Sequence, residues 1–220
     1  MKKVAVILSG CGVFDGSEIH EACAALLALY RAGALAVICA PAGPQMHVMN
    51  HLAGQPEPAA TRDILVESAR LARGKITPLV SLDPGQIDAV LLPGGFGAAK
   101  NLCDFATEGK DCTVHPDVEA FLLEAHRRGK PIGAMCIAPV ILARVFGQTL
   151  HPTLTIGNDR TTAGLIGDMG AVHADCAVVD TVVDRANLMV TTPAYMLAER
   201  IGDVFTGADR LVDRLLELCG

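Results

Sequence analysis

The chain has 220 residues, of which 51% are hydrophobic, enough for one large core in a globular protein. Its 24 acidic residues outnumber its 18 basic residues and leave a net charge of −6. This balance offers no broad basic surface, so it argues against nucleic acid or membrane partners. Because no linker, repeat or low-complexity block interrupts the chain, we expect a single domain over residues 1–220.

The expected compartment follows from the N-terminus and the cysteines. The apolar run over residues 4–8 is too short to span a bilayer and lacks a small-residue cleavage site. The eight cysteines are scattered, include no C-x-x-C pair and lie partly in apolar runs. We expect a cytoplasmic protein, or less readily an organellar one, in which most cysteines are buried thiols.

Short apolar segments and one helical pattern begin the chain. Residues 4–8, 35–39 and 88–92 are continuously apolar and bounded by turn residues, which is typical of strands covered on both faces. Between the first two, apolar residues at helical spacing over 19–30, followed by Gly33, predict a helix.

The middle of the chain predicts a long excursion and then further strand and helix alternation. Four prolines between residues 40 and 61 indicate an excursion, which we expect at the mouth of a pocket, before a helix over about 62–73. A helix should begin at Pro116 and end at Gly129. The apolar residues 131–135 then predict a short strand.

The last segments complete the predicted fold. Residues 178–183 and 188–192 predict neighbouring strands joined by a turn, and 194–219 an amphipathic helix. The alternation as a whole predicts an α/β protein, a three-layer sandwich in which helices cover both faces of a mostly parallel sheet. A ligand site should lie beyond the carboxyl ends of the strands, where the loops after Leu8, Leu92 and Met135 meet.

Cys136 is the strongest candidate for chemistry. It stands between the predicted strand 131–135 and a helix over 138–146, with alanines two residues to either side. Such a turn exposes a nucleophile above a sheet, and the N-terminus of the following helix stabilises a thiolate. The alternative is a buried structural thiol, as most intracellular cysteines are.

A glycine-rich loop over residues 8–18 leaves the first strand. It lacks the Gly-Lys-Ser/Thr ending and the G-x-G-x-x-G spacing of nucleotide loops, which argues against nucleotide binding. We expect Asp15 or Ser17 as the N-cap of the next helix and Glu18 in its first turn, a favourable place for a carboxylate. Because this loop should lie at the same sheet edge as Cys136, Glu18 is also a candidate for proton transfer to substrate.

A second glycine turn, Pro-Gly-Gly-Phe-Gly, follows the strand 88–92. Glycines such as Gly94 and Gly95 let backbone N–H groups approach a substrate, and the N–H groups of Gly95 and Ile137 are candidates to bind a developing oxyanion. Asn101, at the end of this segment, is a further substrate-binding candidate. An ordinary tight turn is the alternative.

The seven histidines suggest no triad and no metal centre. His47 and His51 are four residues apart, but no third ligand is evident and a solvated pair is the simpler interpretation. We assign no histidine to catalysis and expect no metal and no cofactor.

Four segments in this order resemble the ElbB-like branch of the PfpI-type, class I glutamine amidotransferase-like superfamily: residues 8–21, 93–102, 135–139 and 191–196. The resemblance covers essentially the whole chain. It implies a flavodoxin-like sandwich, Cys136 as nucleophile with Glu18 as its partner, and a homodimer. It also implies a glyoxalase without cofactor that converts glyoxal or methylglyoxal to the 2-hydroxy acid and is associated with isoprenoid output.

One residue departs from the wider superfamily. Ile137 occupies the position that is histidine in the PfpI-like proteases, so we do not expect hydrolysis of peptides or glutamine. The predicted reaction begins with addition of Cys136 to a small dicarbonyl or aldehyde. Two alternatives remain open: a redox-sensing or regulatory cysteine protein without turnover, and a non-catalytic binding module in isoprenoid metabolism.

Overall fold

The computed structural model describes residues 1–220, and its centre is a seven-stranded sheet of order β10-β11-β7-β6-β1-β2-β5. The strands are β1 Lys3–Ile7, β2 Leu35–Ala40, β5 Thr77–Pro78, β6 Ala89–Leu92, β7 Ile132–Met135, β10 Val182–Asp184 and β11 Met189–Thr192. Every neighbouring pair is parallel except β10 and β11, which form an antiparallel hairpin. The predicted mostly parallel sheet is confirmed.

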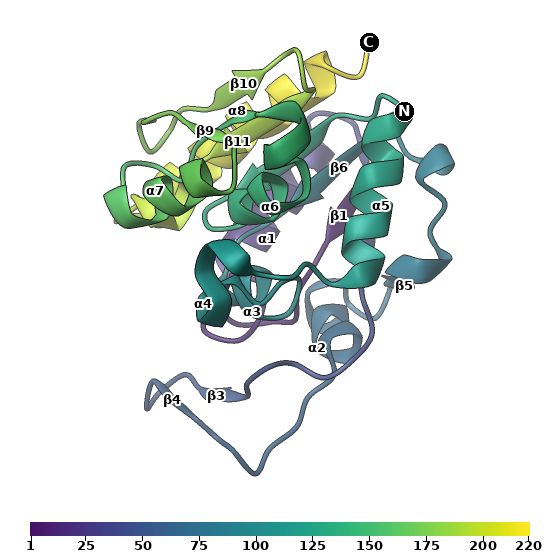
Figure 1. The fold of residues 1–220 in the computed structure, drawn as a ribbon. Helices are drawn as coiled ribbons and strands as arrows, with labels where there is room; N and C mark the ends of the chain where they lie inside the picture. Colours follow the sequence, from purple (N-terminus) through teal and green to yellow (C-terminus); the bar gives the residue numbers. More distant parts are fainter.

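Helices cover both faces of this sheet (Figure 1). One face carries α1 Ile19–Arg31, α2 Ile64–Leu71 and α8 Ile201–Glu217. The other carries α3 Phe96–Lys100, α4 Phe105–Glu108, α5 Pro116–Arg127, α6 Pro139–Leu150 and α7 Arg160–Asp168. The remaining elements are the short strand pairs β3 Met49–Asn50 with β4 Gln55–Pro56 and β8 Thr153–Leu154 with β9 Val172–His173, and 3-10 turns at Leu79–Ser81, Pro84–Gln86, Gly109–Asp111 and Ala194–Met196.

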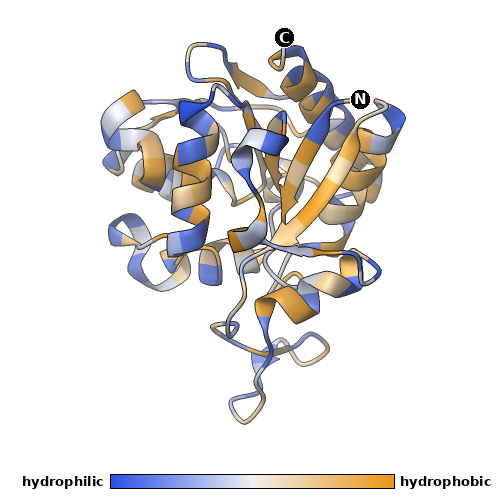
Figure 2. Cartoon of the chain, turned by 90° about the vertical axis from the view of Figure 1, so that its right-hand side faces the viewer, coloured by the Kyte–Doolittle hydropathy of each residue, from blue (hydrophilic) through white to orange (hydrophobic).

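The central strands are apolar on both faces because both faces are covered (Figure 2). In β1, Val4 and Val6 belong to the core beneath α1 and α8, whereas Ala5 and Ile7 belong to the core beneath α5 and α6. All four side chains are fully buried. This pattern confirms the three-layer sandwich.

The C-terminal helix begins later than its apolar pattern indicated. Residues 194–196 form a 3-10 turn, and α8 starts only at Ile201 and then runs unbroken through Gly207. A Cβ at Gly207 would lie 3.1 Å from Thr192 Oγ1 and 3.2 Å from the carbonyl oxygen of Val178. Glycine at this position therefore lets α8 pack closely on the sheet.

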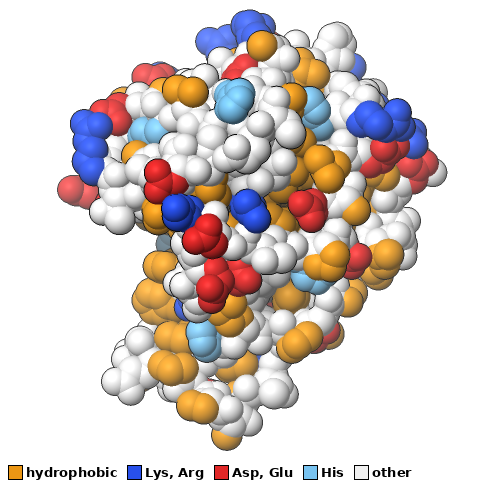
Figure 3. All heavy atoms as spheres, viewed as in Figure 1, with side chains coloured by type: hydrophobic (Ala, Val, Ile, Leu, Met, Phe, Trp, Pro, Cys, Tyr) orange, Lys and Arg blue, Asp and Glu red, His pale blue; other side chains and the backbone are white.

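Residues 41–61, here called the arm, extend away from the body of the molecule and contain the β3–β4 hairpin (Figure 1). Apolar side chains are visible on the arm's surface (Figure 3), and Leu52 at its tip is fully exposed. No helix in the structure combines the length and the apolar character that crossing a membrane would need.

Candidate active site

Cys136 lies at a sharp turn between β7 and α6. Its φ of 60° falls in the left-handed region, which a residue with a side chain adopts at an energetic cost of order 1 kcal/mol or more. The turn is held because the N–H of Cys136 donates to Thr192 O at 3.0 Å and that of Ala138 donates to Met135 O at 3.0 Å. Pro139, at the first position of α6, suits a helix start. The elbow predicted from the sequence is present.

The carboxylate beside the thiol is Glu21 in α1. Its Oε2 accepts from the N–H of Gly94 at 2.8 Å, its Oε1 accepts from the N–H of Tyr195 at 3.1 Å, and the Cys136 thiol donates to the same carboxylate. Burial raises the pKa of Glu21 to about 7, and nearby Glu18 adds to that rise, although the three hydrogen bonds oppose it. Glu21 therefore exchanges a proton near neutral pH.

The predicted N-cap of α1 is wrong, since neither Asp15 nor Ser17 holds that position. Glu18 is the N-cap, and its Oε2 accepts from the N–H of Glu21 at 2.7 Å. Ser17 is occupied elsewhere, because its Oγ accepts from the N–H of Ser9 at 2.9 Å. The helix begins at Ile19, as its apolar pattern predicted, but Glu18 precedes it as the N-cap, and Glu21 in its first turn is buried.

The structure also corrects the choice of Glu18 as the residue paired with Cys136. Glu21, one helical turn further on, makes the hydrogen bond to the thiol, while Glu18 lies on the wall of the cavity that Cys136 also lines. Oε1 of Glu18 is 3.8 Å from Nδ1 of His20. The spacing of three residues between the two glutamates was the available signal, because it places both on one face of a helix.

Backbone N–H groups converge on the sulfur of Cys136. Those of Gly95 and Ile137 point at it, as the oxyanion prediction required. The N–H of Gly94 is not free for this purpose, because Glu21 accepts it. Burial, followed by the Glu21 carboxylate, raises the pKa of the Cys136 thiol well above its usual range, and the two N–H groups oppose that rise.

The two glycines are needed at this position because the chain packs backbone against backbone. A Cβ on Gly94 would lie 2.4 Å from the Cβ of Cys136, and one on Gly95 would lie 2.3 Å from the backbone nitrogen of Glu18. Gly95 also has a φ of +96°, which disfavours any residue with a side chain. The turn is therefore more than an ordinary tight turn, since it presses the Cys136 elbow against the start of α1.

Asn101 corrects another expectation, because it does not line the cavity of Cys136. Its Nδ2 donates to the carbonyl oxygens of Ser9 and Asp15, both at 2.8 Å, and its Oδ1 accepts from the N–H of Met46 at 2.9 Å. These bonds use both amide protons of the buried carboxamide and one lone pair of its oxygen. Asn101 therefore fastens the arm to the glycine-rich loop instead of binding substrate.

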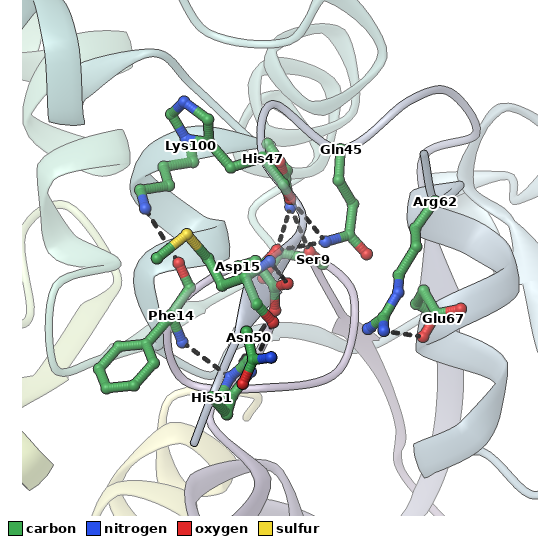
Figure 4. A network of polar contacts seen from close by, with 12 residues as sticks. Ser9, Phe14, Asp15, Gln45, His47, Asn50, His51, Arg62, Glu67 and Lys100 are labelled. Atoms are coloured by element: carbon green, nitrogen blue, oxygen red, sulfur yellow. Dashed lines mark hydrogen bonds and ion pairs between the residues drawn. The ribbon is translucent and has the colours of Figure 1, made fainter. Parts of the chain in front are cut away.

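The arm does not cover the mouth of the cavity, and none of its residues lines it. It is seated against the glycine-rich loop (Figure 4), where Gln45 Nε2 donates to Asp15 O at 2.8 Å and the N–H of Phe14 donates to His51 Nε2 at 3.2 Å. His47 and His51 are not on a helix, and no group of three potential metal ligands occurs in the structure.

The cavity of Cys136 measures about 560 Å³. Of the four hollows in the structure, it is the only one lined by a cysteine. Its thirteen lining residues, nine of them hydrophobic, are Val13, Glu18, Gly95, Phe96, Ala99, Phe105, Ala106, Cys136, Ile137, Asp159, Thr162, Tyr195 and Met196. Tyr195, which the sequence analysis did not single out, contributes its N–H to Glu21 and its hydroxyl to His20 Nδ1 at 2.7 Å.

Comparisons with known proteins show the family of this chain. The chain is 48% identical over 227 residues to the human protein "Glutamine amidotransferase-like class 1 domain-containing protein 3, mitochondrial", covering 99% of this chain and 84% of that protein. The chain belongs to the glutamine amidotransferase-like class 1 family. Another relative of this family, the rat "ES1 protein homolog, mitochondrial", is 46% identical over the same shares of both chains. No family model matches the chain.

Solved structures place the family fold in the DJ-1/PfpI superfamily. An isoprenoid biosynthesis protein with an amidotransferase-like domain from Ehrlichia chaffeensis has a TM-score of 0.90 at 32% identity, over 98% of this chain and 99% of that chain. A DJ-1 superfamily protein from Salmonella typhimurium has a TM-score of 0.59 at 26% identity, over 99% and 91%. The flavodoxin-like fold implied by the resemblance is confirmed.

Proposed function

We propose that the protein is a glyoxalase that requires neither metal nor glutathione and converts a 2-oxoaldehyde to the 2-hydroxy acid through a hemithioacetal on Cys136. The observation that carries this proposal is the thiol of Cys136, hydrogen-bonded to the buried carboxylate of Glu21, with the N–H groups of Gly95 and Ile137 pointing at its sulfur. Two further observations support a role associated with isoprenoid biosynthesis: the ElbB-like sequence motifs, and the similar structure of the isoprenoid biosynthesis protein from Ehrlichia chaffeensis.

The first step forms the carbon–sulfur bond. Glu21 accepts the thiol proton, and the sulfur of Cys136 attacks the aldehyde carbon while the carbonyl electron pair moves to oxygen. The N–H groups of Gly95 and Ile137 stabilise this oxyanion, which then takes up the proton. Because one proton passes between Glu21 and the bound substrate, the pair keeps a single negative charge throughout the step.

The second step is a proton transfer between adjacent substrate carbons. Glu18 faces the cavity, so it removes the proton from the carbon bonded to sulfur and returns it to the neighbouring carbon by way of an enediol. The product of this step is a thioester of the 2-hydroxy acid on Cys136. Water then cleaves the thioester, regenerates the thiol and releases the acid, so that one water is added overall and no redox partner is needed.

The decisive experiment is steady-state turnover of glyoxal and methylglyoxal by chelator-treated protein without glutathione. We expect the variants Cys136→Ala, Glu21→Gln and Glu18→Gln to lose measurable turnover. The matched controls are Cys23→Ala and Glu119→Gln, which change an exposed thiol and an exposed carboxylate outside the cavity and should retain turnover. A wild-type rate no higher than that of buffer would refute the proposal.

A redox-sensing role is the second candidate, and the pKa of Glu21 favours it. With a pKa of about 7, Glu21 is partly protonated at neutral pH and can donate a hydrogen bond to an oxidised sulfur on Cys136. Hydrogen peroxide should then add oxygen to Cys136 before any other cysteine, as peptide mass spectrometry would show. Peroxide sensitivity without aldehyde turnover would favour this role over the glyoxalase.

The homodimer and the cytoplasmic location remain predictions. Light scattering of the purified protein tests the first, and fractionation of the source cells tests the second. Both mammalian relatives are mitochondrial by name, so an organellar location is the alternative to test alongside the cytoplasm.

A further inference from the structure

The cavity of Cys136 is much larger than the smallest 2-oxoaldehydes. Methylglyoxal has five non-hydrogen atoms. If each took up the roughly 30 Å³ that a water molecule occupies in the liquid, methylglyoxal would fill only about 150 Å³. The cavity holds about 560 Å³, within the range of pockets that bind ligands of drug size. Roughly 400 Å³ would therefore stay unfilled around methylglyoxal bound to the sulfur.

Most of the cavity wall is apolar. Phe96 and Phe105 belong to the short helices α3 and α4, Ile137 follows the nucleophile, and Met196 lies in the turn after β11. An apolar substituent on the substrate would be removed from water by these side chains, which stabilises the bound state in proportion to the area buried. A two- or three-carbon dicarbonyl leaves that surface unused.

Both charged side chains that line the cavity are acidic. Glu18 and Asp159 line it, and no lysine or arginine does. The backbone N–H of Thr162 lowers the pKa of Asp159, which is therefore ionised at neutral pH. A nearby cation is Lys100 on helix α3, whose Nζ lies 5.3 Å from the centre of the Phe96 ring. It donates to Phe14 O at 3.0 Å and is not a lining residue. A phosphate or carboxylate on the substrate would meet like charge on Glu18 and Asp159, with no cation among the lining residues.

We infer that the substrate of this site is a neutral 2-oxoaldehyde that carries an apolar chain or ring of up to about ten carbons. The roughly 400 Å³ that methylglyoxal leaves unfilled has room for about that many carbon groups at roughly 30 Å³ or more for each group. This inference rests on the proposed glyoxalase reaction and adds to it the class of substrate. The same negative charges favour release of the product, because hydrolysis of the thioester converts a neutral substrate into a 2-hydroxy carboxylate.

The first test compares kcat/KM for a series of straight-chain 2-oxoaldehydes from three to about twelve carbons in total. We expect kcat/KM to rise by about fourfold for each added methylene until the cavity is filled, as expected for burial of CH₂ groups. A 2-oxoaldehyde of equal length that ends in a carboxylate should be turned over at least about tenfold less efficiently.

Two variants test the walls separately. Ala106→Phe fills part of the cavity and should lower the ratio of long-chain to methylglyoxal kcat/KM at least about tenfold. Its control, Ala53→Phe, is on the exposed arm and should keep the wild-type ratio. Asp159→Asn removes a charge but preserves an N-cap side chain for α7, so it should raise kcat/KM for the carboxylate-ended substrate relative to the neutral one. Asp168→Asn, at the far end of α7, should not.

A binding measurement separates this inference from the proposed reaction. Calorimetry on Cys136→Ala should show 2-octanone binding at least about tenfold more tightly than octanoate. Turnover of methylglyoxal without any gain for longer chains would leave the glyoxalase standing and overturn the substrate class. No turnover of any aldehyde, with 2-octanone still preferred, would refute the glyoxalase and support the class of ligand; no preference in binding would overturn it.

Discussion

From the raised pKa of Glu21 we predict how the free energy of unfolding changes with pH, a property that can be measured without any substrate. Burial shifts this pKa from 4.5 to about 7 in the folded protein. At about 1.4 kcal/mol for each tenfold change in proton affinity, that shift corresponds to about 3 kcal/mol. Because the folded state favours the protonated carboxyl, the contribution of Glu21 to stability is fully present below pH 4.5 and is lost as pH rises through about 7.

The test substitutes Glu21→Gln in a Cys136→Ala background, so that the thiol does not titrate. Removing the thiol also removes a hydrogen bond that lowers the pKa of Glu21, so the rise is retained. Glutamine stays neutral at every pH. The unfolding free energy of the double variant, relative to Cys136→Ala alone, should therefore increase by about 3 kcal/mol between pH 4 and pH 8.

A constant offset accompanies this change and does not affect its slope. The N–H groups of Gly94 and Tyr195 each donate to one carboxylate oxygen of Glu21, and a carboxamide has only one oxygen to accept them. The lost bond should cost about 1 to 3 kcal/mol at all pH values. Urea unfolding at intervals of half a pH unit measures both quantities. Parallel stability curves for the two proteins would refute the assignment of the titrating group to Glu21.

Three further predictions concern the packing of the chain around the site, the attachment of the arm and the packing of the C-terminal helix α8. Gly95→Ala should abolish turnover and lower the unfolding free energy by about 2 to 4 kcal/mol, because its Cβ would overlap the start of α1; wild-type stability in urea would contradict this. Asn101→Ala should cost about 2 to 5 kcal/mol, since three hydrogen bonds are lost, and should speed proteolytic cleavage of the arm, whereas unchanged cleavage would show that other contacts hold it. In α8, a Cβ on Gly202 would meet open space, so Gly202→Ala should raise the melting temperature slightly. Gly207→Val should instead lower the melting temperature, because its side chain would clash with Thr192 and Val178. Equal shifts of the two variants in calorimetry would refute the packing argument.

Much of the architecture follows from local sequence patterns. The apolar runs that became β1, β2, β6 and β7 are short and continuous because both faces of each strand are buried, and the helices between them carry a period of 3.6 residues. The Cys136 elbow was predictable for the same reason, since a strand pattern and a helix pattern meet there with small residues around the cysteine. These features depend on neighbours in the chain.

The pairing of the nucleophile was decided by contacts between distant segments. Glu21 is selected over Glu18 because its oxygens receive N–H groups from Gly94 and Tyr195, 73 and 174 residues away, whereas the carboxylate of Glu18 caps α1. No local period encodes such bonds. Asn101 illustrates the same limit, because its amide is consumed by segments 55 to 92 residues away and cannot serve the cavity. The sequence alone therefore determined the sheet, the helices and the reactive cysteine, whereas the tertiary structure decided which carboxylate serves it, because hydrogen bonds between distant segments depend on how the elements pack.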